Sequence, residues 1–364
     1  MSSPERHGAD LLPLRLKAGT FAPMASLMGM RRLLLPLVAL LALAAAAPAD
    51  AARYLPPGGK AFHCGIGGYK PGSVGAFTKQ AGSHPAVYQY FVSWRARSSD
   101  LHWMEGLLRN TEQARSRTML HVSTSDTALN PRKIARGRGD RFLVALNRLL
   151  GSQTSPTYIR LMSEMNNGGN PYAAYDLAGR SRGPAYSTGA FKRAWRRTTL
   201  ILRGGSVARV NRRLRRLRMP PVRAESLERP RVAMLWVPLT FGNPEIARNH
   251  PVHWWPGSRY VDWVGSTWYS KHPNAAAFSR FYANPRWRRK PFALSEYGVW
   301  GREDPGFVHK VHRWARSHRV KLLCYYQGAL FKPEFRLSTH PRSRGALRGL
   351  LKASWLTPFA PEFR

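Results

Sequence analysis

The stretch at 157–170, TYIRLMSEMNNGGN, constrains the fold of this chain more than any other part of it. It begins as an apolar, β-branched run, which is typical of a buried strand. It then changes abruptly to a carboxylate, amides and glycines, which are typical of a loop. Glu164 therefore lies where a strand ends, at the rim where parallel barrels build their sites. A helix cap or an ion pair is the alternative role for this carboxylate, since a buried charge needs a partner.

Strand and helix patterns alternate along the rest of the chain. Strands are predicted at 62–67, 86–92, 118–122, 157–162, 231–237, 260–266, 291–294 and 320–326. Helices are predicted at about 74–80, 101–115, 133–150, 187–217, 274–283, 305–317 and 343–353. This alternation favours a single-domain (β/α)8 TIM barrel over a doubly wound sheet. The stretch 238–259, rich in Pro, His and Trp, predicts a long loop where a fifth helix would otherwise stand.

Residues 1–51 are predicted to be an upstream segment plus a secretory signal peptide, outside the fold. A basic segment ends at Arg32, an apolar run covers 33–47, and small residues around Ala51 provide a cleavage site before Ala52. An uncleaved membrane anchor is the alternative, although the apolar run is short for a spanning helix. The sequence therefore predicts a barrel domain at 52–364 that is secreted and works outside the cell or at the cell wall.

Acidic residues are scarce in this chain, so their positions are informative. The chain has 58 Lys and Arg against 19 Asp and Glu, a formal net charge of +39. Glu164 and Glu296 both fall at the ends of predicted strands. Paired carboxyl groups across a pocket are the machinery of glycoside hydrolysis, in which one protonates the leaving oxygen and the other attacks the anomeric carbon or activates water. Two structural glutamates are the alternative interpretation.

A family resemblance rests on three motifs, IRLMSEMN (159–166), YVDWVG (260–265) and ALSEYG (293–298). Together, in this order and spacing, they resemble glycoside hydrolase family 26, which contains β-mannanases and related β-glycanases. The resemblance implies a (β/α)8 barrel and a retaining mechanism with two glutamates. It implies Glu164 as the acid/base, Glu296 as the nucleophile, and Tyr269 as a hydrogen-bond partner of the nucleophile.

One departure from the family concerns the residue before the acid/base. The mannanases of the family usually carry His there, whereas this chain has Ser163. That His helps hold the sugar at the cleavage point. The expected partner is therefore a β-linked polysaccharide, mannan-like or a related glycan, and the two-Glu mechanism is expected whichever sugar it is.

Other side chains near predicted strand ends are candidates for sugar binding, because flat rings pack on sugar C–H faces and polar groups bond hydroxyls. These candidates are Asn166, Trp236, Trp268, Trp300, Tyr325, His121, Trp254 and Trp255. Core packing is the alternative for any one tryptophan, and a core histidine is the alternative for His121. His250 and His253 have no third ligand in view, so neither a metal nor a cofactor is expected.

The two cysteines, Cys64 and Cys324, fall in the first and eighth predicted strands. These strands are neighbours when a barrel closes, and export permits oxidation. A disulfide forms only if the two side chains face one another, and two buried thiols are the alternative.

The basic residues are clustered at 132–141, 212–218 and 286–290. The last two clusters precede the fifth and seventh strands, which predicts that they lie at the amino end of the barrel. We expect the charge to hold an anionic cell-wall polymer, in a manner that weakens with salt. The competing interpretation is a catalytically inactive, strongly basic barrel that binds polyanionic cell-wall polymer or nucleic acid. No obligate protein partner is predicted.

Overall fold

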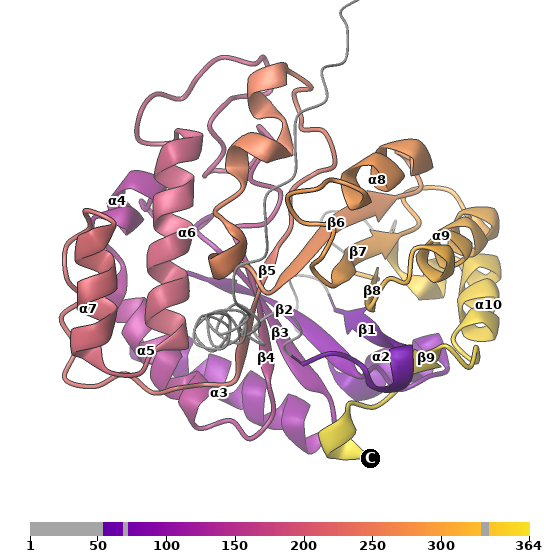
Figure 1. Ribbon diagram of the computed structural model, residues 1–364. Coiled ribbons are helices and arrows are strands. Elements are labelled where there is room, and N and C mark those ends of the chain that lie inside the picture. Colours follow the sequence, from indigo (N-terminus) through magenta and orange to yellow (C-terminus); the bar gives the residue numbers. More distant parts are fainter. Residues whose placement is uncertain (1–53, 68–71, 329–334) are drawn as a thin grey trace, which may run out of the picture. The chain divides into compact units, whose positions relative to one another are not determined.

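The computed structural model describes residues 54–67, 72–328 and 335–364, and in these ranges eight parallel strands form a closed barrel (Figure 1). Neighbouring strands pair in chain order, and the first strand pairs with both the second and the eighth. The strands are β1 (Ala61–Ile66), β2 (Val87–Ser93), β3 (Arg117–Ser123), β4 (Thr157–Leu161), β5 (Val232–Trp236), β6 (Trp263–Tyr269), β7 (Phe292–Gly298) and β8 (Leu322–Tyr326). A short strand, β9 (Leu356–Thr357), pairs with β1. The predicted (β/α)8 barrel is confirmed.

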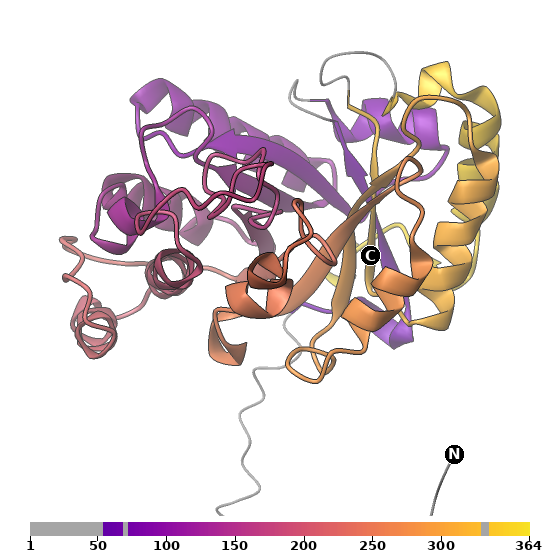
Figure 2. The same cartoon turned by 90° about the horizontal axis from the view of Figure 1, so that it is seen from above.

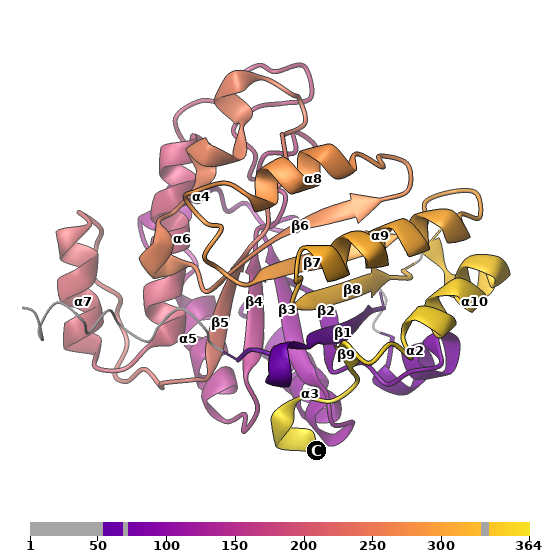
Figure 3. The same ribbon diagram turned by 45° about the vertical axis from the view of Figure 1, so that its right-hand side comes forward.

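Helices cover the outside of the barrel, and Figure 3 shows α8, α9 and α10 beside the later strands. The helices are α2 (Val74–Ala81), α3 (Ser98–Gln113), α4 (Pro131–Ala135), α5 (Asp140–Gly151), α6 (Thr188–Arg203), α7 (Val207–Arg216), α8 (Ala275–Tyr282), α9 (Pro305–Ser317) and α10 (Pro341–Leu350). Short 3-10 helices lie at Pro57–Gly59, Ala247–Asn249, Pro251–Trp254, Ser258–Tyr260, Leu337–Thr339 and Pro361–Phe363. The stretch between β5 and β6 is thus the long loop that its composition predicts.

The N-terminal segment and signal peptide predicted at residues 1–51 lie outside the described residues. Within the described part of the chain, no helix combines the length and the apolar character that crossing a bilayer requires.

Two of the predicted helices are each divided in two. The helix predicted at 187–217 breaks at Gly204, whose backbone is left-handed with φ of 56°. A Cβ at Gly204 would lie 1.7 Å from the carbonyl oxygen of Glu228, so only glycine fits here without a shift of the backbone. The helix predicted at 133–150 likewise becomes α4 and α5, with a turn between them.

Helix α7 runs back along α6, and Figure 2 shows it at the margin of the barrel. Arg193, near the start of α6, donates to the carbonyl oxygen of Arg218 at 2.6 Å. Because α6 begins on the side of the strands' carboxyl ends, the basic end of α7 lies toward that side. This corrects the expectation for 212–218, which assumed one continuous helix descending to β5. Residues 286–290 directly precede β7, at the amino end of the barrel.

Alternate residues along each strand face the barrel interior or the surrounding helices. One buried cluster fills the interior, with Phe62, Cys64 and Ile66 from β1 among its members. A larger buried cluster lies between the strands and the helices. This alternation decides which of the predicted site residues can reach the interior at all.

A disulfide joins β1 to β8. Cys64 and Cys324 are partners in the strand register, their Cα atoms lie 4.2 Å apart, and they are 260 residues apart in sequence. Closing so long a segment restricts the unfolded chain, which stabilises the folded state.

We expect the variant Cys64→Ala/Cys324→Ala to lose about 2–5 kcal/mol of unfolding free energy, because its unfolded chain regains that freedom. Urea denaturation with and without reductant measures the loss, and reductant should lower the midpoint of the natural chain but not that of the variant. Mass spectrometry of the unreduced protein is the direct check. Two alkylatable thiols in the freshly isolated protein would contradict the bridge.

Candidate active site

A pocket of about 250 Å³ lies at the carboxyl ends of the strands. Residues from several strands and from the loops that follow them line it: Phe91, His121, Arg160, Ser163, Glu164, Asn170, Tyr269, Glu296, Trp300, Tyr326 and Phe335. A second hollow of about 500 Å³ adjoins it and shares Glu164, Tyr269 and Trp300 with it. The two hollows together form an elongated site with Glu164 at their junction.

A β-bulge directs Glu296 into this pocket. Strand β7 continues to Gly298, so Glu296 lies inside the strand and not after it. The register with β6 shifts by one residue, because Ser266 pairs with Leu294 but Thr267 pairs with Glu296. Leu294 belongs to the outer cluster, and strict alternation would place Glu296 on that same outer face. The extra residue in β7 turns the carboxyl group inward instead.

Three donors hold the carboxylate of Glu296, whose residue is only 7% exposed. Arg160 forms an ion pair with Oε1, and the amide of Gln89 donates to the same oxygen at 3.4 Å. The hydroxyl of Tyr269 donates to Oε2 at 2.6 Å. Burial, and then the charge of Glu296, raises the pKa of Tyr269 well above its usual value, so the hydroxyl keeps its proton and donates it to the carboxylate.

Arg160 supplies the positive charge on this side of the pocket. It is fully buried, and burial alone would lower its pKa, but the charges of Glu296 and Glu164 outweigh burial and raise the pKa above its usual value. The guanidinium group is therefore a permanent cation that compensates the carboxylate it contacts.

Glu164 follows β4 in a backbone conformation that is uncommon for a residue with a side chain, with φ of 52°. Its amide donates to the carbonyl oxygen of Val237 at 2.6 Å, which fixes the turn. The hydroxyl of Thr267 donates to its Oε1 at 2.7 Å, and the amide of Asn167 donates to Oε2 at 3.3 Å.

The two carboxyl groups have different environments. Burial, and then the charge of Glu296, raises the pKa of Glu164, so this carboxyl keeps its proton to a higher pH than an ordinary Glu. Glu296 is instead paired with the cation of Arg160. A carboxyl group that keeps its proton, beside a carboxyl group bound by an arginine, is the equipment for acid-assisted displacement at a carbon centre.

His121, on β3, places an imidazole ring next to the serine that precedes Glu164. Its Nε2 lies 2.9 Å from the Oγ of Ser163, and both residues line the pocket. Burial, and then the charge of Arg160, lowers the pKa of His121 well below its usual value, so the ring is neutral near pH 7. A neutral imidazole can accept a hydrogen bond from a bound hydroxyl or donate one to it.

The structure brings five of the predicted site residues to one pocket: Glu164, Glu296, Tyr269, His121 and Trp300. Trp300 is 40% exposed and lines both hollows, so its ring is available to a ligand.

Three aromatic candidates on strands face the helices and not the pocket. Trp236, Trp268 and Tyr325 belong to the outer buried cluster. The ring of Trp236 lies 5.0 Å from that of Trp255, a fourth candidate, in a cluster away from the pocket lining. The expectation that these residues bind substrate is corrected: Trp236, Trp268 and Tyr325 occupy strand positions that alternate with the inward ones, and Trp255, in the loop after β5, packs against the outer cluster.

Two further candidates have structural contacts. Trp254 is fully buried, and its ring packs against Phe191 at 5.2 Å. Asn166 is also fully buried, and its side-chain amide accepts from the backbone nitrogen of Leu239 at 2.8 Å and donates to the carbonyl oxygen of the same residue at 3.0 Å. Asn166 thus fixes the loop after β5, which lines the second hollow, and does not reach a ligand itself.

Several pocket residues are absent from the sequence-based candidates. Arg160, Gln89 and Thr267 contact the two glutamates directly, and Phe91, Tyr326 and Phe335 form aromatic walls. Arg160 carries a signal that could have identified it, since a charged residue inside an apolar strand needs a buried partner. Within the described ranges, no three His, Cys, Asp or Glu side chains gather in an arrangement that could hold a metal ion.

Comparisons with known proteins identify structural neighbours only. No family model matches the sequence, and no curated protein matches it. A modular endo-β-1,4-mannanase of glycoside hydrolase family 26 from Cellulomonas fimi matches with a TM-score of 0.58 and 13% identity, over 83% of this chain and 72% of that one. The family 26 domain of an endo-β-mannanase/endo-β-glucanase from Prevotella bryantii matches with a TM-score of 0.54 and 12% identity, over 82% of this chain and 90% of that one. At this identity the likeness shows a shared barrel fold.

Proposed function

We propose that this protein is a secreted retaining β-glycoside hydrolase of the family 26 type. The observation that carries the proposal is the pair of carboxyl groups in one pocket, with the pKa of Glu164 raised and Glu296 paired with Arg160. The barrel shared with family 26 structures and the three sequence motifs support the same assignment.

In this mechanism the two glutamates have distinct tasks. Glu296 attacks the anomeric carbon and forms a covalent glycosyl-enzyme, while Glu164 gives its proton to the leaving glycosidic oxygen. Glu164 then removes a proton from water, which attacks the same carbon from the opposite side and releases the sugar with its original configuration. Arg160 and Tyr269 fix the attacking carboxylate, and the hydroxyl of Tyr269 stays close to the reacting centre.

The proposed substrate is a β-linked polysaccharide, a mannan or a related glycan. Two adjoining hollows that meet at Glu164 suit a chain of several sugars with the cleaved bond at the junction. Ser163 with His121 stands where the mannanases of the family carry a single His, so this pair would contact the sugar at the cleavage point.

A polysaccharide panel tests the function. The purified protein is incubated with mannan, galactomannan, xylan, mixed-linkage β-glucan and carboxymethyl cellulose, beside Glu296→Gln as the inactive control. We expect one of these β-linked chains to release reducing ends, and proton NMR to show the β-anomer first. Initial release of the α-anomer would contradict the retaining mechanism. Failure on all of them, with no difference between the natural chain and the control, would favour the inactive basic barrel.

A further inference from the structure

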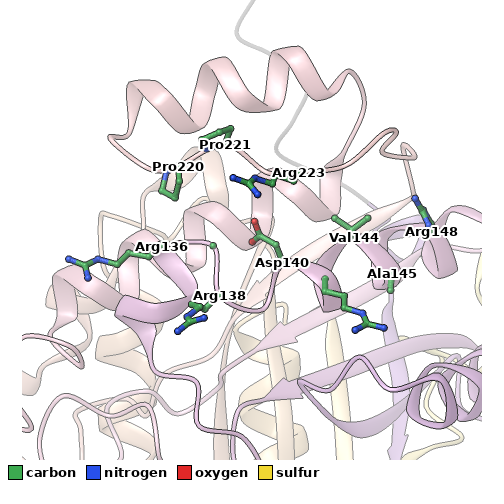
Figure 4. A pocket seen from close by; sticks show the side chains of 11 residues that line it. Arg136, Arg138, Asp140, Val144, Ala145, Arg148, Pro220, Pro221 and Arg223 are labelled. Carbon is green, nitrogen blue, oxygen red and sulfur yellow. The ribbon is translucent and has the colours of Figure 1, made fainter.

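A hollow of about 840 Å³ lies on the flank of the barrel and shares no lining residue with the active pocket (Figure 4). It is formed by α5, by the turn that precedes α5, and by the segment that follows α7. Five arginines line it, Arg136, Arg138, Arg141, Arg148 and Arg223, and all of them are exposed.

No carboxylate of the described residues forms an ion pair with these five guanidinium groups. Among the ion pairs and side-chain hydrogen bonds of the described residues, none involves them. The hollow contains one carboxylate, that of Asp140, but the buried Arg197 already binds both of its oxygens. Like charges gathered in one concavity repel one another, and folding alone gives no reason to place them together.

The arginines are spread along the hollow. Arg141 and Arg148 are seven residues apart on α5, with Val144 and Ala145 on the same face between them. Seven residues of helix extend about 10 Å. Figure 4 shows Arg136 and Arg138 at one end of the hollow and Arg148 at the other. One small anion cannot contact all of these groups, whereas a chain with repeated anionic groups can.

The lining distinguishes between kinds of anionic chain. Guanidinium groups bind carboxylates and phosphates through paired hydrogen bonds. The remaining lining includes Val144, Ala145, Pro220 and Pro221, and no aromatic ring is among the residues that line this hollow in the described chain. Single-stranded nucleic acids usually bind where their bases stack on aromatic side chains, and this hollow offers none.

We propose that this hollow binds an acidic polysaccharide, a glycan that carries repeated carboxylate or phosphate groups. The exposed arginines of α7, which leads into the lining segment, add to the positive field at its edge. The site is separate from the two glutamates, so binding here does not require the protein to be a glycosidase.

The test compares two triple variants of the full chain that remove equal charge. Arg141→Gln/Arg148→Gln/Arg223→Gln changes the hollow, and Arg286→Gln/Arg288→Gln/Arg289→Gln changes exposed arginines before β7. Fluorescence anisotropy with labelled polygalacturonate and with labelled phosphorylated dextran measures affinity. We expect the hollow variant to bind at least one of them about tenfold more weakly, and the control variant to change little. The affected probe identifies the preferred anionic group.

Equal weakening by both triple variants would overturn the proposal, because net charge alone would then explain binding. Tighter binding of a single-stranded DNA oligomer than of either glycan, with the same dependence on the hollow arginines, would also overturn it and assign the hollow to nucleic acid. Thermal unfolding checks that each variant folds. Arg148→Gln alone, on the exposed face of α5, is the substitute should the triple variant be unstable. Inactivity on the polysaccharide panel has no bearing on this result.

Discussion

Replacing Glu164 by alanine should slow hydrolysis of an unactivated polysaccharide by about 10²–10⁴-fold, because the leaving oxygen then departs without a proton. With an aryl glycoside that has a good leaving group, the variant's rate of glycosyl-enzyme formation should fall much less, since that group leaves without a proton. Added azide should attack the glycosyl-enzyme in place of activated water and yield a β-glycosyl azide. Glu225→Ala, which removes an exposed carboxylate elsewhere, is the matched control and should keep the natural rate.

The same carboxyl should set the upper limit of the pH range. Burial and the charge of Glu296 raise the pKa of Glu164, and a general acid works only while protonated. The value of kcat/KM should therefore fall as pH rises through that raised pKa, above the range where an ordinary Glu titrates. The descending limb should be missing from the aryl-glycoside profile of Glu164→Ala. A limb that persists there would assign the titration to another group.

Removing Arg160 should have the largest effect on stability. Arg160→Met leaves the carboxylate of Glu296 buried without its cation, and breaking a buried pair from one side costs about 3–5 kcal/mol. Urea denaturation measures the loss. The double variant Arg160→Met/Glu296→Gln should regain much of this stability, because no unpaired charge remains, and should stay inactive.

A double-mutant cycle separates charge from packing in this test. The exposed pair of Arg97 and Asp100 provides the comparison, and Arg97→Met should change stability little because solvent screens that pair. Equal instability of Arg160→Met and the double variant would show that the pair itself is not the cause and that the lost side-chain packing is.

The barrel could be predicted because its signals are local. Apolar runs of strand length, separated by amphipathic stretches of helix length, already favour a parallel barrel surrounded by helices. The break at Gly204 was missed because helical patterns flank it on both sides, and the close approach of the Glu228 backbone, which requires glycine there, is a tertiary contact. Before α5 the chain turns through Gly137 and Gly139, which both have positive φ. The register of β7 shifts against both neighbouring strands, and this bulge, which places Glu296 inward, leaves no mark in the sequence pattern.

The aromatic candidates Trp236, Trp268 and Tyr325 were mispredicted for a different reason. Strands of a parallel barrel are buried on both faces, so Leu235 and Trp236 are equally apolar and the pattern does not tell which of them faces inward. Glu164 and Glu296 were easier to find, because a carboxylate among apolar residues stands out whichever face it takes. Arg160 stands out by the same criterion, and applying it to cations as well as acids would have found the partner of Glu296.

The bridge between Cys64 and Cys324 also makes most of the barrel a covalent ring. A single backbone cut anywhere between these two residues leaves both fragments attached to one another. Within the described chain each of the strands β1 to β8 is paired on both sides, so the severed ends stay aligned by their neighbours. Proteolytic cleavage of an exposed loop between the two cysteines should therefore leave the two fragments joined and the barrel assembled.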